Sequence, residues 1–254
     1  MFSIAISGTN ALCQPFRTTL KRSGTTLCDL TTDQGRDGVE TLLFLPRDIM
    51  ESERLLFEDE CWAKTLPGLR TIVIAATLSP RYVRALRGRI ARRIDVIDAP
   101  VVGAPRAVEA GQASFLVGGP AAAVARMQPL LDILGHASTR MGEFGTAMAA
   151  KALQDCLSAA SSALTRSALD WAEAQGIEER RLVPLLEATF GGRVQRSAID
   201  PASLMHNALP GDDAGAALVK HVESALDTAL KGQHLTPPRS FEAPSASHRS
   251  RHLH

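Results

Sequence analysis

A change of residue pattern near Gly142 constrains the fold of this chain more than any other feature. Up to about Ser138, short β-type runs alternate with helix-sized stretches, which is typical of βαβ units around a parallel sheet. The candidate strands are residues 3–7, 26–30, 41–45, 71–75, 95–97 and 114–117. From Gly142 to about Leu230 the β-type runs vanish, and Ala, Leu, Glu, Gln and Arg recur with helical spacing. The sequence therefore predicts an α/β domain followed by an all-α domain.

The junction between the two patterns reads Gly-Glu-Phe-Gly at residues 142–145. After it we expect one continuous helix to about Gln175, where Gly176 provides a stop at the C′ position. A helix of about 30 residues usually packs against a second domain or subunit. We place the α/β domain at 1–140 and the helical domain at 141–232. Residues 233–254 are rich in His, Pro, Ser and Arg, and such a stretch predicts a disordered tail.

Composition excludes several classes of function. The chain has 254 residues, 45% of them hydrophobic, and a formal net charge of +1. The near-balanced charge gives no general attraction to nucleic acid or to an anionic membrane, so we expect neither partner. No apolar run approaches the ~18 residues that span a bilayer, and no signal peptide is evident, so a cytoplasmic location is expected. The four cysteines form no C-x-x-C pair and predict neither disulfides nor a metal site.

Residues 3–24 have the strand, turn and helix layout of a dinucleotide-binding Rossmann unit. In the G-x-G-x-x-G fingerprint the first glycine makes the tight turn, the second lets the backbone approach the pyrophosphate, and the third allows close packing of helix and strand. Those positions here read Gly8, Asn10 and Cys13. Asn tolerates unusual backbone angles and Cys is small, so we expect the fold to persist with a lower cofactor affinity. An ordinary βα turn is the alternative interpretation.

The connection between the second and third candidate strands is too short for a standard Rossmann half. Only residues 31–39 separate them, and at ~3.3 Å per residue they span at most about 30 Å. This length allows an extended crossing of the sheet edge and predicts an abbreviated parallel sheet with no helix here. Asp29 or Asp33 is a candidate for binding a cofactor ribose, or a solvated turn residue. Without an arginine at the end of strand two, NAD is slightly favoured over NADP.

Several ordered motifs carry a resemblance to a known family. Residues 98–105 read DAPVVGAP, followed by Glu-Ala-Gly at 109–111 and Leu-Val-Gly-Gly at 116–119. This stretch resembles the D-A-P-V-S-G-G…E-A-G-T…V-G-G segment of the β-hydroxyacid dehydrogenases, which include 3-hydroxyisobutyrate and 6-phosphogluconate dehydrogenases. Residues 142–151 resemble the family's G-x-x-G-x-G-x-x-x-K helix. Further matches are FLP at 44–46, TLSP at 77–80, and residues 218–227, so the likeness covers 3 to about 238, without the family's usual last helices.

The resemblance implies a Rossmann-type cofactor domain, a helical second domain and a cleft between them, where hydride passes between NAD or NADP and a hydroxy acid. It assigns the proton-exchanging role to Lys151, and the place of an orienting amide one turn later to Asp155. A carboxylate there would pair with the lysine, keep it protonated and repel an anionic substrate. The implied cofactor-binding residues are Gly8, Thr9, Asn10, Leu45, Pro46, Thr77 and Lys220. The implied substrate cradle is Val102, Gly103 and Ala104, in which the family's serine is replaced by Val102.

Two functional hypotheses follow. In the first, the chain is an NAD(P)-dependent oxidoreductase resembling 3-hydroxyisobutyrate dehydrogenase, with a small hydroxy acid or related carbonyl compound as substrate. In the second, it is a catalytically inactive relative that serves as a binding or assembly module. By resemblance, a homodimer formed through the helical half is expected. A short-chain dehydrogenase is excluded because the only tyrosine, Tyr82, has no lysine four residues later, and no P-loop motif occurs.

Overall fold

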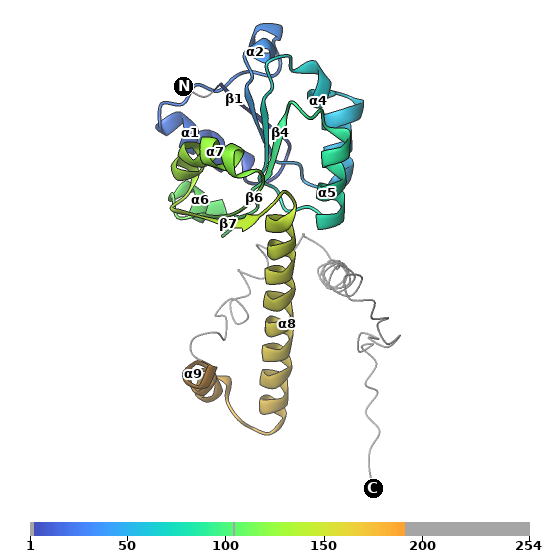
Figure 1. Cartoon of the computed structure of the whole chain (residues 1–254). Coiled ribbons are helices and arrows are strands. Elements are labelled where there is room, and N and C mark those ends of the chain that lie inside the picture. Colours follow the sequence, from blue (N-terminus) through green and yellow to red (C-terminus); the bar gives the residue numbers. More distant parts are fainter. Residues whose placement is uncertain (1–2, 104, 191–254) are drawn as a thin grey trace.

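The computed structural model describes residues 3–103 and 105–190. Its strands form one seven-stranded sheet, from which a long helix projects (Figure 1). The strands are β1 (Ile4–Ser7), β2 (Thr41–Phe44), β3 (Thr71–Ile74), β4 (Asp95–Asp98), β5 (Val101–Val102), β6 (Ser114–Gly118) and β7 (Ala137–Gly142). The helices are α1 (Cys13–Arg22), α2 (Asp33–Asp37), α3 (Ile49–Glu53), α4 (Trp62–Thr65), α5 (Pro80–Arg89), α6 (Pro105–Glu109), α7 (Ala121–Leu134), α8 (Thr146–Ala174) and α9 (Glu179–Phe190), with a π-helical turn η1 (Arg54–Glu58) after α3.

The sheet has the order β1-β2-β3-β4-β6-β5, and β7 pairs with β6. Strands β1 to β4 are parallel neighbours, as are β6 and β7, whereas β6 runs antiparallel to β4 and β5. Because β1 pairs directly with β2, the prediction of an abbreviated parallel sheet is confirmed. The parallel order brings the carboxyl ends of β1 to β4 to a single edge.

Two apolar layers cover the two faces of the sheet. Along β2, Leu43 belongs to one buried cluster and Leu42 and Phe44 to the other, as expected when alternate side chains point to opposite faces. Helices α1 and α7 cover the first face, contributing Phe16 and Leu130 among others. Helices α4 and α5 cover the second face. The predicted Rossmann-type N-terminal domain is therefore confirmed.

Five of the six predicted strands form, with ends within about two residues of the expected ones. The prediction of a strand at 26–30 is wrong, because this stretch makes only one β-bridge, from Leu27 to Ile4. The prediction that 31–39 holds no helix is also wrong. The Thr32 hydroxyl accepts a hydrogen bond from Gly35 N at 3.1 Å and caps the five-residue helix α2. Strands β5 and β7 were not predicted.

The long helix forms where the sequence predicts it. Helix α8 has 29 residues, so it is about 44 Å long, and it projects away from the sheet toward α9 (Figure 1). Gly176 follows it with a φ of 72°, the left-handed backbone expected of a C′ glycine. The predicted helical domain extends to 232 and the predicted tail to 254, and everything beyond residue 190 lies outside the described residues.

Candidate functional site

The turn after β1 packs directly on the chain that leaves β2. Gly8 has a φ of +123°, and a Cβ at this position would lie 2.0 Å from the Leu45 carbonyl oxygen and 2.7 Å from Pro46 N. Only glycine fits such a position. Asn10 N donates to the same Leu45 oxygen at 3.1 Å. The structure thus brings together four of the predicted cofactor residues, Gly8, Asn10, Leu45 and Pro46, at the carboxyl edge of the sheet.

Two amides at the start of α1, those of Leu12 and Cys13, bond to Asn10 within the turn. The Asn10 side-chain oxygen accepts from Leu12 N at 3.0 Å, and its backbone oxygen accepts from Cys13 N at 2.9 Å. The Cys13 thiol is buried and donates to Gly8 O at 3.2 Å, and burial raises the pKa of this thiol. Asn10, at the second glycine position of the fingerprint, therefore supplies acceptors to amides at a helix N-terminus, where anions otherwise bind.

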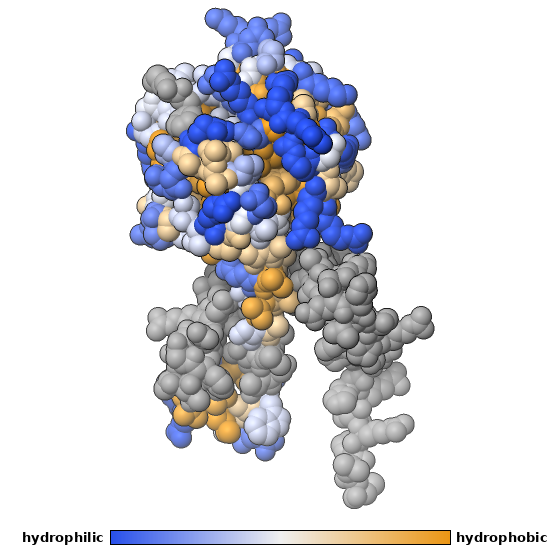
Figure 2. Space-filling model, in the orientation of Figure 1, coloured by the Kyte–Doolittle hydropathy of each residue, from blue (hydrophilic) through white to orange (hydrophobic). Residues whose placement is uncertain are grey.

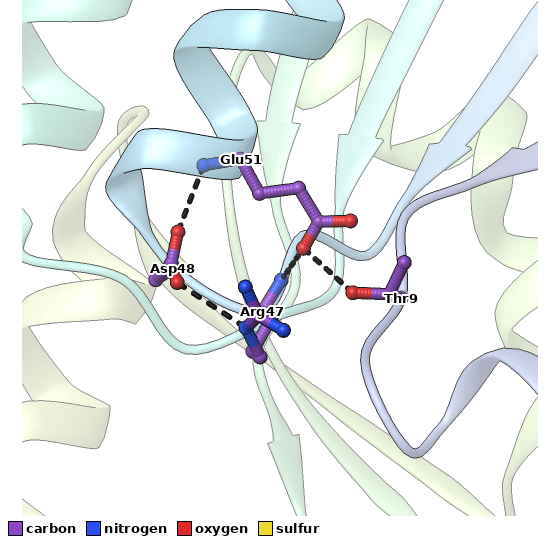
Figure 3. Close-up of polar contacts among 4 residues, drawn as sticks. All are labelled: Thr9, Arg47, Asp48 and Glu51. Carbon is purple, nitrogen blue, oxygen red and sulfur yellow. Dashed lines mark hydrogen bonds and ion pairs between the residues drawn. The ribbon is translucent and has the colours of Figure 1, made fainter.

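A small cavity of about 240 Å³ opens beside this turn, lined by Thr9, Arg47, Asp48, Met50, Glu51 and Arg54. The Glu51 carboxylate points from α3 toward the turn (Figure 3). It accepts from the Thr9 hydroxyl at 2.9 Å and from Arg47 N at 2.6 Å. Asp48 caps α3 by accepting from Glu51 N at 2.8 Å, and this bond lowers the pKa of Asp48. A carboxylate thus occupies the centre of the polar contacts at the turn.

The start of α8 is held against the sheet by a buried carboxylate. Asp98, the last residue of β4, is fully buried and accepts from Gly145 N at 2.8 Å and from Met148 N at 2.7 Å. Burial raises the pKa of Asp98, although the bonds from these two amides oppose the shift. A Cβ on Gly118 would lie 2.4 Å from the Asp98 Oδ1 atom, so the carboxylate needs a glycine there. Asp98 therefore fixes where α8 begins.

Lys151 and Asp155 form the predicted i, i+4 pair on α8. The Lys151 Nζ lies 2.5 Å from the Asp155 Oδ1, and the two side chains are 13% and 33% exposed. Three residues before Lys151, the Met148 sulfur lies 3.4 Å from Leu78 N and can accept a hydrogen bond from it. This contact brings the first turns of α8 next to the segment after β3, which contains the predicted cofactor residue Thr77. The lysine is thus shielded beside the carboxyl edge of the sheet.

The chain is similar in sequence to known dehydrogenases. A family model described as the NAD binding domain of 6-phosphogluconate dehydrogenase matches residues 39–142. The 3-hydroxyisobutyrate dehydrogenase of Pseudomonas aeruginosa is 26% identical over 166 residues, which are 65% of this chain and 56% of that protein. The NAD-dependent L-serine dehydrogenase of the same organism is 29% identical over 178 residues, 69% of this chain and 58% of that protein. The chain thus spans a little over half the length of these relatives.

These matches, together with the fold, support a member of the β-hydroxyacid dehydrogenase family. The Mycobacterium tuberculosis 3-hydroxyisobutyrate dehydrogenase, solved with L-serine, shares the fold with a TM-score of 0.72 at 18% identity, over 94% of this chain and 89% of that one. A Myxococcus stipitatus imine reductase variant in complex with NAD+ gives a TM-score of 0.67 at 18% identity, over 90% and 87% of the two chains. The likeness in fold covers nearly the whole of each of these structures.

The segment predicted to form the substrate cradle lies in a different part of the sheet from the first turn. Val102 is in β5 and pairs with Ser114 of β6, and Gly103 follows it as an exposed residue. Because β6 lies between β4 and β5 in the sheet, these residues are set apart from the group at Gly8. The other two predicted site residues, Ala104 and Lys220, lie outside the described residues. Within the described residues, no cluster of three His, Cys, Asp or Glu side chains could hold a metal ion.

The side chains beside the first turn include donors suited to a diphosphate. The tight turn at Gly8 is kept, and the Thr9 hydroxyl and the guanidinium groups of Arg47 and Arg54 are donors suited to phosphate oxygens. Both arginines are more than 60% exposed, in ion pairs with Asp48 and Asp59. These donors fit a diphosphate, whereas the carboxylates of Asp48 and Glu51 in the same lining oppose it.

Two residues that matter in this site were missed by the sequence reasoning. Asp98 belongs to the quoted family motif but was given no role, because its partners lie 47 and 50 residues further along the chain. Glu51 was missed as well. The pattern Asp-x-x-Glu at residues 48–51 is a capping-box signal and could have located α3, but the sequence does not show that Glu51 also reaches Thr9.

Proposed function

We propose that the chain is an NAD(P)-dependent oxidoreductase that exchanges a hydride with a small hydroxy acid or a related carbonyl compound. The observation that carries this proposal is the shielded Lys151, held beside the carboxyl edge of the sheet by the anchored start of α8. The retained turn at Gly8 supports it from the cofactor side. The relatives named above are dehydrogenases of small hydroxy acids by name, which favours the same class of substrate.

The lysine pair favours the reductive direction. A bound reduced nicotinamide would supply the hydride to the carbonyl carbon. Lys151 would then give a proton from its Nζ to the carbonyl oxygen, so that the product is an alcohol. Asp155, whose Oδ1 lies 2.5 Å from the Nζ, pairs with the lysine and holds this donor in place. It also places a negative charge near the substrate, which favours a carbonyl compound whose own charge lies away from the reacting carbon.

The finer features of the function are part of the same proposal. NAD is favoured over NADP because Asp29 is a candidate for binding the cofactor ribose. Asp29 lies two residues after the β-bridge at Leu27, and its carboxylate accepts from Thr31 N at 2.9 Å and from the Thr31 hydroxyl at 2.8 Å. The four cysteines are free thiols, which supports a cytoplasmic protein. None of the helices in the described part of the chain is long and apolar enough to cross a membrane.

We also propose that the chain forms a homodimer through its helical half. In this proposal the α/β domain comprises residues 1–140, the helical domain 141–232 and the tail 233–254. Figure 2 shows apolar surface on α8 below the sheet domain. Three large apolar side chains of this helix are exposed, with exposed fractions of 50%, 72% and 67% for Leu153, Leu157 and Trp171. An apolar helix surface of this kind supports association with another chain.

A second candidate function has an observation of its own. The catalytically inactive relative is favoured by the first turn, where Asn10 satisfies Leu12 N and Glu51 binds the Thr9 hydroxyl. A binding or assembly module needs the fold without an open cofactor site. This candidate predicts no turnover with either nicotinamide cofactor.

The experiment that tests the proposal compares binding with turnover. Calorimetry with NADH and NADPH measures the Kd of each, and the absorbance of the reduced nicotinamide follows turnover of small keto acids, aldehyde acids and imines. We expect Lys151→Met to lower kcat by about 100-fold or more with little change in the cofactor Kd. The control, Lys64→Met, removes the same charge at an exposed position and should leave both unchanged. Absence of any Lys151-dependent turnover at millimolar cofactor would favour the inactive relative.

A further inference from the structure

The first turn carries an anion of its own. In a Rossmann unit the pyrophosphate lies at the turn after the first strand, against the N-terminus of the first helix. Here the Glu51 carboxylate lies against that turn, 2.9 Å from the Thr9 hydroxyl (Figure 3). Glu51 comes from α3, which follows β2, so a different segment of the chain supplies this charge.

Two contacts hold the carboxylate in this position. Arg47 N donates to the same Glu51 oxygen at 2.6 Å, in a variant of the capping box in which Asp48 is the N-cap. The bond from Thr9 ties the oxygen to the turn. One Glu51 oxygen therefore accepts from both Arg47 N and the Thr9 hydroxyl. These two hydrogen bonds fix the rotamer of the Glu51 side chain.

A carboxylate in this place opposes a diphosphate. Two unit charges about 5 Å apart repel each other appreciably at a partly exposed site, and a pyrophosphate brings two negative charges. The guanidinium groups of Arg47 and Arg54 attract such an anion, but each is already in an ion pair with an aspartate. A dinucleotide that binds at the turn has to displace Glu51 from Thr9 and bear its repulsion.

We propose that Glu51 is a resident anion that sets the affinity of this turn for a nicotinamide dinucleotide, which binds only by displacing the carboxylate from Thr9. The inference rests on the proposed function, because it assumes that the turn receives the cofactor. It makes Glu51 a residue that determines affinity and takes no part in the chemistry. Loss of its charge alone, with the acceptor retained, should open the site.

The test uses Glu51→Gln in the full chain. The glutamine oxygen can still accept from Arg47 N and from Thr9, so the cap of α3 is kept while the charge is removed. Glu58→Gln, at an exposed position in η1, is the control with the same change of charge. Calorimetry with NADH and with ADP-ribose measures affinity, and a thermal melt shows that each variant is folded. ADP-ribose carries the pyrophosphate without the nicotinamide and reports on the turn alone.

We expect Glu51→Gln to bind both ligands at least about tenfold more tightly than the natural chain, which is about 1.4 kcal/mol, and Glu58→Gln to bind like the natural chain. Affinities equal within threefold, or no binding by a folded Glu51→Gln variant at millimolar ligand, would overturn the inference. Tighter binding without any Lys151-dependent turnover would leave the role of Glu51 intact and contradict the proposed function. The two proposals can therefore fail separately.

Discussion

Two turns at the sheet domain use the amides at the start of a helix in different ways. At the first, before α1, the amide of Leu12 bonds to the Asn10 side chain, and the nearby Thr9 hydroxyl bonds to Glu51. At the second, before α8, the amides of Gly145 and Met148 bond to Asp98, which is fully buried. The first set of acceptors lies at the surface and can turn away, whereas the second has no room to move.

Because the acceptors are at the surface in one turn and buried in the other, only the first turn can exchange its acceptors for a ligand. At the first turn a bound anion can replace side-chain acceptors without disturbing the core. At the second turn the acceptor is part of the core, and its task is to hold the helix that carries Lys151. The first turn has lost two of the three fingerprint glycines, while the second keeps the glycines at 142 and 145. Substitutions at the second turn should therefore change stability, and substitutions at the first should change binding.

The largest effect is expected at Asp98. Asp98→Asn keeps one acceptor oxygen but turns an amide donor toward the N–H of Gly145 or Met148 in a buried place. An unsatisfied buried donor costs about 1 to 3 kcal/mol, and the loss of the charge-assisted bond adds to it, so we expect a loss of about 3 kcal/mol of unfolding free energy. Urea unfolding followed by circular dichroism measures it. The control, Asp95→Asn, removes a partly exposed partner of Arg126 and should cost under about 1 kcal/mol.

The pH dependence of stability gives an independent readout of Asp98. Burial raises the pKa of its carboxyl in the folded chain above the ordinary value of about 3.9. Between these two values the folded chain keeps a proton that the unfolded chain has released, so the contribution of Asp98 to stability falls as pH rises through this range. Asp98→Asn should remove this slope and Asp95→Asn should keep it. Equal slopes in both variants would show that Asp98 is not the titrating group.

The parts of the fold that sequence could predict have strong periodic patterns. The strands β1 to β3 are short, mainly apolar runs that are buried on both faces, and α8 has helical spacing up to a glycine stop. Strand β7 reads Ala-Ser-Thr-Arg-Met-Gly and is mostly exposed, so it has no apolar signal. The stretch at 26–30 has the composition of a strand, but it lies outside β1 with no further strand beyond it in the described sheet. Its only pairing is the bridge from Leu27 to Ile4. Local pattern identifies an element, and the surrounding contacts decide whether it forms.

The same division holds for the candidate site. The pair of Lys151 and Asp155 follows from i, i+4 spacing, which fixes contact within one helix. The bond from Thr9 to Glu51 joins residues 42 positions apart, and it depends on β1 and β2 being parallel neighbours. Asp98 acts across a similar distance in the sequence. Contacts within an element could be predicted, and contacts between elements needed the packed sheet.

The next effect in size is expected at Asp155, within the region held by the second turn. Asp155→Asn keeps the shape of the side chain and removes the ion pair that holds the Lys151 Nζ at 2.5 Å. The lysine side chain then has more freedom to leave its position, and we expect kcat for carbonyl reduction to fall about tenfold. Steady-state kinetics with the reduced cofactor measure it. Asp170→Asn, at an exposed position on the same helix, should leave kcat unchanged. An unchanged kcat in Asp155→Asn would show that the pair does not position Lys151 for the reaction.

The smallest effect is expected at Asn10 in the first turn. Asn10→Gly restores a glycine at the second fingerprint position and frees Leu12 N from its side-chain acceptor. We expect the affinity for ADP-ribose to rise about fivefold, which is about 1 kcal/mol, as measured by calorimetry. The added backbone freedom of glycine should lower stability by up to about 1 kcal/mol.

A matched variant separates the two causes that Asn10→Gly combines. Asn10→Ala also frees Leu12 N, but it keeps a Cβ where the pyrophosphate would approach. If the lost acceptor accounts for the gain, both variants should bind ADP-ribose equally well; if the Cβ blocks the approach, only the glycine variant should gain. Asn10 accepts from Leu12 N and Glu51 accepts from the Thr9 hydroxyl, so the two side chains engage different donors. The gains in ADP-ribose affinity from Asn10→Gly and Glu51→Gln should therefore multiply in the double variant. An affinity unchanged in both Asn10 variants would mean that the Leu12 amide is no part of the cofactor site, and the contrast between the two turns would then rest on Glu51 alone.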